Sequence, residues 1–578
     1  MINININGKD LQVAENTTIL EAAKLVNARI PTLCHMNLHE LKVHNQIASC
    51  RICMVEVEGR RTLVPSCSEK CTEGMVIKTH TPRALNARRM AVQLLLSNHP
   101  KDCLSCEMNL DCELQKLAAE LNITGIKFQG EMMDFEVDTS SKAIVKNPNK
   151  CVMCRRCETM CNIVQSCGVL SAINRGFDAF VGPAFNVPMV ESSCTFCGQC
   201  VAVCPTAALV EVDHSKAVWR ALSDEKKHVI VQTAPAIRVA IGEEFGMQPG
   251  EISTGKLAAS LRALGFDGVF DTDFAADLTI MEEASELVHR IQHDGKLPIL
   301  TSCCPAWVNF FEHHYPDLLD VPSSCQSPQI MFGSIAKTYY AKKMGIDPKD
   351  IFVVSVMPCL AKKAEAQRPE LFLDGMPRVD AVVTTREYAK MLKQAGIDFA
   401  NLEEEDFDKI MGESTGAGVI FGTTGGVIEA ACRTAYEWIT GEELAKLEFT
   451  DLRGLEGVRS AKIKLGDMDI NIGIAHGLSN AARLLDSIKA GEVDLQAIEI
   501  MACPGGCIGG GGQPYHHGNV EIIEKRQAAL YREDQNKTRR KSHENQEVMK
   551  LYKEFLGEPY GEKAHQLLHT NYFPQRTL

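Results

Sequence analysis

The chain has 578 residues, of which 45% are hydrophobic and 23% are charged, which is typical of a globular protein with several domains. Its formal net charge of −13 argues against binding to nucleic acid or to an anionic membrane surface. No apolar run approaches the roughly 20 residues of a membrane-spanning helix. The start, MINININGKD, lacks the basic and apolar regions of a signal peptide. We therefore expect a cytoplasmic protein with neither nucleic acid nor membrane as a partner.

The chain contains 24 cysteines. A disulfide framework requires an oxidising compartment and usually belongs to a small domain, and neither condition fits this sequence. Closely spaced thiols in a reducing compartment are more often metal ligands. The spacing of the cysteines should therefore indicate which metals are bound.

Residues 1–80 begin with alternating isoleucines and a turn at Asn7-Gly8, followed by a helix that Thr18 and Glu21 open as a capping box. The cysteines that follow are Cys34, Cys50, Cys53 and Cys67. Their order is similar to the plant-type ferredoxin pattern for a 2Fe–2S cluster, although 15 residues rather than four separate the first two. A zinc site is the alternative. Cys71 is interpreted as a spare thiol.

Residues 81–138 contain the segment HPKDCLSCEMNLDC. The segment contains three cysteines, Cys103, Cys106 and Cys112, whereas a 4Fe–4S cluster needs four protein ligands. His99 is the nearby residue that could be the fourth ligand. A lone histidine next to proline is otherwise more often an ordinary loop residue. Zinc on three cysteines and one histidine is the competing interpretation.

Residues 139–215 carry two copies of C-x₂-C-x₂-C-x₃-C, CVMCRRCETMC and CTFCGQCVAVC, which is the pattern of two-cluster bacterial ferredoxins. In that pattern the fourth cysteine of each run serves the other cluster. The first 4Fe–4S cluster is thus expected on Cys151, Cys154, Cys157 and Cys204, and the second on Cys161, Cys194, Cys197 and Cys200. Together the first 215 residues suggest an electron-transfer chain that leads to a catalytic centre elsewhere.

Residues 228–515 have few cysteines and several short apolar, β-branched runs separated by helical stretches such as 254–264 and 280–292. The runs lie at 228–234, 297–302, 351–357, 379–385, 470–477 and 497–502. This pattern predicts α/β architecture with largely parallel, buried strands. In such proteins ligands bind beyond the carboxyl ends of the strands. Four of these ends read TAP, TSCCP, MPC and MACPGGC, so we expect them to meet at one metal centre at the edge of a central sheet.

The strand ends carry five cysteines, which is one more than a single 4Fe–4S cluster needs as ligands. Cys359, Cys503 and Cys507 with either Cys303 or Cys304 would hold a further 4Fe–4S cluster. Neighbouring side chains on extended backbone point in opposite directions, so Cys303 and Cys304 are poorly placed to be twin ligands. The remaining thiol could exchange protons beside the metal.

TSCCPAW, MPCLAKKAE and EIMACPGGCIGGGGQP resemble the three signature motifs of the iron-only (FeFe) hydrogenases, in the family's order. The resemblance extends over nearly the whole chain, in the long clostridial-type modular form. It implies a β-grasp 2Fe–2S domain, a His/Cys₃ module, a two-cluster ferredoxin domain, an α/β H-cluster domain and a C-terminal helical segment, 516–578. It also supports His99 as a ligand, and it implies one 2Fe–2S cluster and three 4Fe–4S clusters besides the H-cluster.

By the same resemblance Cys304, Cys359, Cys503 and Cys507 hold the 4Fe–4S part of the H-cluster. Cys507 would bridge to a di-iron subsite with CO, cyanide and azadithiolate ligands. Lys362 resembles the lysine that holds a cyanide, since a compact cation with several donors suits a small anion. Further residues around the di-iron unit would be Pro235, Ala236, Gln329, Met357, Phe421, Gly422 and Met501. Ala236 replaces a serine of many relatives, and the glycines after Cys503 would allow close backbone approach to the metal.

Cys303 resembles the thiol that passes protons to the bridging amine, with a route outward through Glu283, Ser323, Glu286 and Arg290. Glu283, Glu286 and Arg290 are spaced i, i+3 and i+7, which places them on one side of a helix. Without the resemblance this pattern would indicate a solvated helix face. Ser324 is adjacent to Ser323 and makes that assignment less specific. Cys167, Cys325 and Cys432 lack cluster spacing and are interpreted as buried small apolar residues, with a redox role for Cys325 as a minor alternative.

The resemblance implies the reaction 2H⁺ + 2e⁻ ⇌ H₂. It is strongest to the catalytic subunit of NAD(P)-linked, multi-subunit hydrogenases, which would exchange electrons with ferredoxin and with partner subunits that bind flavin and NAD(P). The chain itself shows no NAD or flavin motif, because the segment GIAHGLSNAARLL lacks G-x-G-x-x-G. The alternatives are a stand-alone ferredoxin-dependent hydrogenase, a sensory or assembly protein on the same fold, and a pure electron-transfer polyferredoxin.

Overall fold

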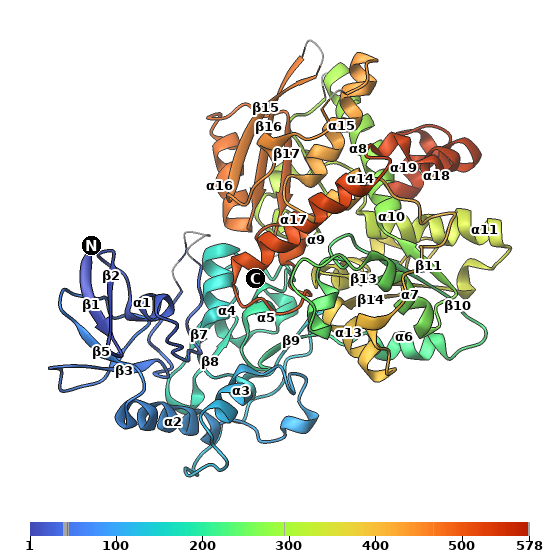
Figure 1. Ribbon diagram of the computed structural model, residues 1–578. Helices are drawn as coiled ribbons and strands as arrows, with labels where there is room; N and C mark the ends of the chain where they lie inside the picture. The colour runs from blue at the N-terminus through green and yellow to red at the C-terminus, as the bar shows by residue number, and fades with distance from the viewer. Residues whose placement is uncertain (39–42, 44, 294, 445, 466–467, 576–578) are drawn as a thin grey trace.

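A computed structural model describes residues 1–38, 43, 45–293, 295–444, 446–465 and 468–575 (Figure 1). The last three residues of the predicted C-terminal segment lie outside the described residues. Figure 1 shows an N-terminal lobe, blue to cyan, beside a larger lobe that contains the rest of the chain. Among the described residues, no helix is long and apolar enough to cross a bilayer.

The chain begins with a five-stranded sheet packed on helix α1, Ile19–Leu25. Asn7 and Gly8 both have positive φ, as a two-residue hairpin loop requires, and Thr18 caps α1 in a capping box with Glu21. Both expectations are confirmed. The sheet order is β2-β1-β5-β3-β4, with β1 at Ile2–Ile6, β2 at Lys9–Val13, β3 at Met54–Val57, β4 at Val64–Pro65 and β5 at Val76–Lys78.

Short elements connect this sheet to the larger lobe. Helices α2, Pro82–Ser97, and α3, Glu113–Glu120, surround the loop of the His99 motif. Two small hairpin-like sheets and three short helical segments then carry the eight ferredoxin-type cysteines. These elements are β6 Ile144–Lys146, β7 Ser171–Ile173, β8 Phe180–Gly182, β9 Leu209–Glu211, α4 Arg156–Thr159, the π-helical turn Met160–Val164 and α5 Gln199–Val203.

The larger lobe contains two four-stranded sheets. The first has the order β11-β10-β13-β14 and is entirely parallel, with β10 at His228–Thr233, β11 at Gly268–Asp271, β13 at Ile351–Met357 and β14 at Ala381–Thr384. The second has the order β12-β17-β16-β15, with β12 at Ile299–Leu300, β15 at Val458–Leu465, β16 at Met468–His476 and β17 at Ala497–Met501. Strand β15 is antiparallel to β16 and the other pairs are parallel.

The expectation of one central sheet is therefore wrong, although its strands are correct. The predicted runs divide between two sheets because β12 pairs with β17 and not with any strand of the β10–β13 sheet. The predicted helix 254–264 is confirmed as α7, Thr254–Leu264, whereas 280–292 is the second half of the longer helix α8, Asp273–Gln292.

The C-terminal segment crosses the larger lobe as α17, Val520–Asn536, which Figure 1 shows in orange-red running diagonally between the strands β15–β17 and the strands of the other sheet. It continues through α18, Gln546–Leu551, and α19, Glu562–Leu568. After α19 the backbone pairs with the loop that precedes helix α10, Pro328–Ile335, since Gln326 N donates to Leu568 O at 2.8 Å and Thr570 N to Ser324 O at 2.8 Å. The last part of the chain thus reaches the same loop as the predicted proton route.

Candidate active site and electron path

Four cysteines meet in one buried cavity between the two sheets. Cys359 follows β13 of the first sheet, whereas Cys304 follows β12 and Cys503 follows β17 of the second. Cys507 begins the short helical turn Cys507–Gly509. All four line the cavity together with Cys303, Lys362, Gln329, Pro235, Met357, Phe421 and Met501, among others. The fold therefore brings together most of the residues predicted for the H-cluster.

Cys304 and Cys303 face different surroundings. Cys304 is the N-cap of helix α9, Pro305–His314, and its Sγ accepts a hydrogen bond from Ala502 N at 3.4 Å. Cys359, Cys503 and Cys507 line the same cavity as Cys304, and burial, followed by the charge of neighbouring cysteines, raises the pKa of each of these three thiols. Cys303 belongs to the apolar cluster of Phe421 and Met501, whereas Cys304 contacts that cluster and also a second one, against which Cys359 packs. This is the opposite orientation that neighbouring residues on extended backbone adopt.

The donor set fits a cluster with small anionic ligands. Gln329 Oε1 is buried and has no hydrogen-bond partner among the described residues. Lys362 Nζ donates to Cys303 O at 3.1 Å and to Glu365 Oε2 at 3.0 Å, which leaves one of its three donors for a ligand. Burial alone would lower the pKa of Lys362, but Glu365 and Cys359 outweigh burial and raise it. The lysine thus provides a permanent positive charge in the cavity.

Two predicted pocket residues lie just behind the cavity wall. Ala236 is buried and its carbonyl accepts a hydrogen bond from Gln513 Nε2 at 2.9 Å. A Cβ on Gly422 would lie 3.4 Å from Ala236 Cβ and 2.6 Å from Leu530 Cδ1. Neither is among the residues that line the cavity. Their place in the structure is therefore to support the wall from outside.

The glycines after Cys503 allow backbone segments to approach each other. Gly506 has a φ of 96°, and a Cβ there would lie 2.7 Å from Thr424 N. A Cβ on Gly510 would lie 2.2 Å from Pro358 O, and one on Gly511 would lie 2.6 Å from the carbonyl carbon of Gly198. The observed close contacts are thus between this loop and the loops that carry Cys359 and the ferredoxin-type cysteines.

The three charged residues predicted for the proton route all lie on α8. Glu283 and Glu286 are buried, with exposed fractions of 6% and 1%, so this side of the helix is not a solvated face. Burial, with Glu286 as the second cause, raises the pKa of Glu283 to about 8. Burial, followed by Glu283, also raises the pKa of the Cys303 thiol well above its ordinary value. Both groups therefore hold protons near neutral pH.

The outer part of the route is a hydrogen-bonded group around Glu286. Ser323 Oγ donates to Glu286 Oε2 at 2.8 Å, and Arg290 Nη2 donates to Glu286 Oε1 at 2.6 Å. Ser324 Oγ also donates to Glu286 Oε2, at 3.3 Å. Ser323 makes the shorter bond, but the structure brings both serines to the same carboxylate.

Two residues at this site, Ser302 and His569, were not predicted. Ser302 Oγ lies 3.4 Å from Glu283 Oε1. His569 Nδ1 lies 2.8 Å from Oγ of Ser324, the serine that the sequence offers beside Ser323, although the two residues are 245 positions apart in the chain. Cys325 is buried, as expected, but its Sγ lies 3.9 Å from Glu286 Oε2 and its neighbours are carboxylates. Only the fold could reveal His569, whereas Ser302 stands beside Cys303 in the sequence.

The ferredoxin-type cysteines group as the two-cluster pattern predicts. Cys151, Cys154, Cys157 and Cys204 line one buried cavity. Cys161, Cys194, Cys197 and Cys200 interact electrostatically with one another, although they come from two separate runs. Cys167 lies beside the second group, where burial, followed by Cys197, raises its pKa well above the ordinary value.

The second ferredoxin group adjoins the catalytic cavity. Cys197 is close enough to raise the pKa of Cys503. Gln165 Nε2 donates to Ala502 O at 2.8 Å, and Gln199 Nε2 donates to Gly509 O at 2.9 Å. These side chains tie the ferredoxin-type loops to the loop of Cys503 and Cys507, so an electron could pass between the two sites over a short distance.

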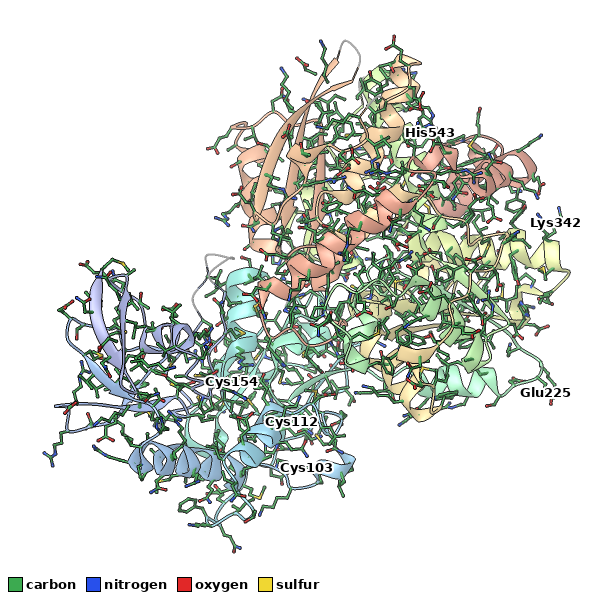
Figure 2. The ribbon with its side chains drawn as sticks, viewed as in Figure 1. Cys103, Cys112, Cys154, Glu225, Lys342 and His543 are labelled. Atoms are coloured by element: carbon green, nitrogen blue, oxygen red, sulfur yellow. The ribbon has the colours of Figure 1, made fainter. Side chains whose placement is uncertain are left out.

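The other two cysteine groups lie farther along the N-terminal lobe. His99, Cys103, Cys106 and Cys112 line one cavity, and His99 Nδ1 is buried without a hydrogen-bond partner among the described residues. Burial lowers the pKa of His99 to about 4, which keeps the ring neutral as a metal ligand must be. Figure 2 shows Cys103, Cys112 and Cys154 in the N-terminal lobe, and Cys112 and Cys154 belong to one apolar cluster with Cys34.

In the first domain all four cysteines are free thiols, and the Cys50 thiol lies within hydrogen-bonding reach of Cys34, as the Cys67 thiol does of Cys53. The charge of Cys34 also acts on Cys53 and Cys67, so the four thiols form one group. Cys71 is buried nearby, and burial, followed by Glu21, raises its pKa to about 11. Cys432 is buried in an apolar cluster on the larger lobe. Cys71 and Cys432 are thus both buried, which agrees with their interpretation as thiols that do not bind a cluster.

Sequence models of five families match the chain. The iron only hydrogenase large subunit, C-terminal domain, matches residues 227–511, and the iron hydrogenase small subunit matches 520–575. A 2Fe-2S iron-sulfur cluster binding domain matches 1–82, the NADH-ubiquinone oxidoreductase-G iron-sulfur binding region matches 88–127, and a 4Fe-4S binding domain matches 187–210.

Two relatives are similar to the chain over almost its whole length. It is 58% identical to the NADP-reducing hydrogenase subunit HndD of Solidesulfovibrio fructosivorans, over 100% of both chains. It is 41% identical to iron hydrogenase 1 of Clostridium pasteurianum, over 99% of this chain and 100% of that one. A solved structure of an FeFe hydrogenase from Chlamydomonas reinhardtii superposes with a TM-score of 0.57 at 44% identity, covering 63% of this chain and 99% of that one.

The chain therefore belongs to the iron-only (FeFe) hydrogenase family. It is an oxidoreductase that catalyses hydrogen oxidation and proton reduction, with electrons relayed through iron–sulfur clusters. Its cofactors include 2Fe–2S and 4Fe–4S clusters and an H-cluster. The expected fold class, a series of iron–sulfur modules followed by an α/β domain with parallel sheets, is confirmed.

Proposed function

We propose that this chain is the catalytic subunit of an NAD(P)-linked, multi-subunit hydrogenase. Its 58% identity to an NADP-reducing hydrogenase subunit, over the full length of both chains, supports this assignment. We assign residues 1–80 to a 2Fe–2S domain, 81–138 to the His/Cys₃ module, 139–215 to a two-cluster ferredoxin domain, 228–515 to the catalytic domain and 516–578 to the C-terminal segment. The observation that carries the catalytic assignment is the convergence of five thiols on one cavity.

The H-cluster would be held by Cys304, Cys359, Cys503 and Cys507, with Cys507 bridging to a di-iron subsite with CO, cyanide and azadithiolate ligands. The fixed charge of Lys362 suits a small anionic ligand such as cyanide. When bound, this cofactor supplies the iron at which two electrons and two protons combine to H₂. One 2Fe–2S cluster and three further 4Fe–4S clusters would occupy the cysteine groups of the N-terminal lobe.

The chain's own residues would deliver protons. The Cys303 thiol lines the cavity and is buried beside the Glu283 carboxyl, which holds a proton below about pH 8. A proton passed from Cys303 into the cavity would be replaced from Glu283, and Glu283 would be recharged from Glu286 through Ser323. Proton transfer of this kind requires groups that are held in place and exchange protons near the working pH.

Electrons would enter at the N-terminal lobe. The chain has no dinucleotide-binding motif, so NAD(P) and flavin would bind to partner subunits, and ferredoxin would exchange electrons with one of the N-terminal clusters. A stand-alone ferredoxin-dependent hydrogenase is the alternative, since iron hydrogenase 1 is also similar over the whole chain. Purification of the native protein distinguishes the two: we expect flavin-containing subunits and H₂-dependent NAD(P)⁺ reduction, whereas a single active subunit that reduces only ferredoxin would support the alternative.

Adjacent cysteines provide the sharpest test of the site. In protein matured with the H-cluster, Cys303→Ala should retain iron and the infrared bands of CO and cyanide but lose nearly all H₂ turnover. Cys304→Ala should lose the bands and the turnover together. Equal loss of the bands in both variants, or wild-type turnover by Cys303→Ala, would contradict the proposed roles.

A further inference from the structure

We propose that His569 carries protons between Glu286 and solvent, through the hydroxyl of Ser324. This inference rests on the proposed role of Glu286 in proton transfer. It adds a path by which protons pass from Glu286 to solvent through the C-terminal segment. The contacts that lead to it run from Glu286 to Ser324, from Ser324 to His569, and from His569 to the surface.

Arg290 cannot serve as the proton carrier at this end of the route. A guanidinium group remains protonated in proteins and therefore neither accepts nor releases protons at neutral pH. Its donors are also occupied, because Nη2 bonds to Glu286 Oε1 at 2.6 Å and to Pro322 O at 2.9 Å, and Nη1 bonds to Val321 O at 2.8 Å. Arg290 thus fixes the position of the carboxylate while another group must exchange its protons.

Ser324 provides a hydroxyl with contacts on both sides. Its Oγ lies 3.3 Å from Glu286 Oε2 and 2.8 Å from His569 Nδ1. When Glu286 is protonated, its O–H can donate to Ser324 while Ser324 donates to the free Nδ1. As the carboxyl proton moves to Ser324, the serine proton moves to Nδ1, which leaves a carboxylate and an imidazolium. No electrons are transferred, and the serine has the same number of protons before and after.

The other face of the His569 ring is prepared for a positive charge. Its Nε2 lies 3.0 Å from Glu282 Oε2, and this carboxylate also accepts a hydrogen bond from Tyr560 N at 2.8 Å. Tyr552 donates its hydroxyl to the second oxygen of Glu282. Glu282 thus acts as an acceptor, so Nε2 of His569 carries a hydrogen. An imidazolium here would donate to Glu282 on one side and to Ser324 on the other.

His569 lies one ring away from the surface. His569 itself is buried, with an exposed fraction of 9%. Its ring centroid is 4.2 Å from that of His565, which is exposed. His565 in turn packs against Tyr560, with ring centroids 4.4 Å apart. The imidazolium at His569 would release its proton to solvent beside His565. The groups that face His569 from all the elements around it are Glu282, Glu286, Ser324, Cys325, Tyr552, Tyr560 and His565.

The test uses the complete protein matured with the H-cluster and measures H₂ evolution and oxidation with a viologen dye from about pH 5 to pH 9. His569→Gln places an amide near Nε2 and keeps a donor for Glu282, but it cannot exchange protons. We expect turnover to fall about tenfold or more, with a changed pH profile, unchanged CO and cyanide infrared bands, and recovery on addition of imidazole. His80→Gln, a change at an exposed histidine of the first domain, should leave turnover unchanged.

Ser324→Ala tests the same path without altering the His569–Glu282 contact. Because the two residues act in series, the double variant should be no slower than the slower single variant. The inference would be overturned if His569→Gln kept the wild-type turnover and pH profile, or if imidazole did not restore its turnover. It would also be overturned if the losses of the two single variants multiplied in the double variant. Absence of H₂ turnover in the wild-type protein would instead overturn the proposed function, so the two failures are distinguishable.

A second readout does not depend on turnover. In protein that lacks the di-iron subsite, NMR of labelled histidines follows the hydrogen bonds of the His569 ring directly. Ser324→Ala removes the hydroxyl that lies 2.8 Å from Nδ1, so the Nδ1 resonance should shift in that variant while the resonance of Nε2, which contacts Glu282, should not. An unchanged Nδ1 resonance would contradict the contact on which the path depends.

Discussion

The electron side and the proton side of this molecule are constructed differently. In the N-terminal lobe each group of proposed ligands comes from one to three short sequence windows, and the strands between them have two to five residues. In the catalytic domain the ligands come from the ends of β12, β13 and β17, which belong to two sheets. The proton route adds a third distant segment, the C-terminal one. Short spacing thus suffices to position clusters, whereas the position of the proton route depends on the whole tertiary structure.

The two sides also differ in what holds them together. The thiols of the first domain are themselves part of its small core, as Cys53, Cys67 and Cys71 show. The catalytic domain has a large apolar core around β10 and β13 that contains no predicted ligand. Metal binding therefore contributes more to the folding of the N-terminal modules than to that of the catalytic domain.

The largest expected effect follows from that difference. Removal of iron by a chelator under reducing conditions should make residues 1–215 sensitive to limited proteolysis, while 228–575 remains resistant. Mass spectrometry of the fragments gives the boundary. Simultaneous loss of both halves would show that the catalytic domain also depends on its metal for folding.

A smaller effect is expected from Asp534, which attaches the C-terminal segment. Both of its oxygens accept hydrogen bonds from Arg433 at 2.9 Å, and Arg540 adds two more. Asp534→Ala removes one of the two carboxylates of the buried Arg433 and leaves Glu429, at 2.8 Å, as the other, so the free energy of unfolding should fall by about 2–3 kcal/mol. Glu448→Ala removes a more exposed partner of Arg540 and should cost about 1 kcal/mol or less. Denaturant unfolding of both variants measures the difference.

The contribution of Asp534 should also depend on pH. Burial alone would raise the pKa of Asp534, but the hydrogen bonds from Arg433 and Arg540 outweigh it and lower the pKa. A carboxylate with a lowered folded-state pKa stabilises above its ordinary pKa of about 3.8 and loses this effect as pH falls through the folded value. The stability gap between wild type and Asp534→Ala should therefore be full at pH 7 and shrink below about pH 4. A constant gap would contradict the ion-pair explanation.

A comparable effect on rate, without loss of stability, is expected at Glu286. Glu286→Gln keeps the shape and the acceptor oxygen for Arg290 but cannot exchange a proton. Turnover should fall about 100-fold, which corresponds to about 3 kcal/mol in the barrier. Glu558→Gln changes an exposed carboxylate and should have no effect on turnover. A Glu286→Gln enzyme that keeps the wild-type rate would exclude this carboxylate from the route.

The smallest expected effect lies in the first domain. Thr18 caps α1, with Glu21 N donating to Thr18 Oγ1 at 3.2 Å. Thr18→Ala should destabilise this domain by about 1 kcal/mol, while Thr18→Ser keeps the hydroxyl and most of the stability. Turnover with a small dye should be unchanged. Hydrogen exchange of the α1 amides reports the local effect, and equal exchange in Thr18→Ala and wild type would contradict the role of the cap.

Local chemistry in the sequence predicted the local features of the fold. The hairpin at Asn7-Gly8, the cap at Thr18 and the strands of the catalytic domain follow from turn preference, capping and β-branched runs. The exchange of Cys161 and Cys204 between the two ferredoxin groups also followed from spacing alone. Each of these features is determined by residues that are close in sequence or by a repeated motif.

The rest depends on contacts between distant segments. Periodicity placed Glu283 and Glu286 on one face of α8 but could not show that this face is buried. The division of the strands into two sheets depends on which strand β12 joins. His569 reaches Ser324 because α19 ends beside the loop that precedes α10. No local pattern encodes these pairings.

Isotope exchange between H₂ and D₂O tests the separation of the two sides most directly, because it requires protons at the catalytic site but no electrons from outside. We predict that Cys194→Ala, which removes a thiol of the second ferredoxin group, slows reduction of an external acceptor but exchanges isotopes at about the wild-type rate. Glu283→Gln should lose both activities while it retains the infrared bands of the H-cluster. Wild-type exchange by Glu283→Gln, or loss of exchange by Cys194→Ala with intact bands, would contradict the account.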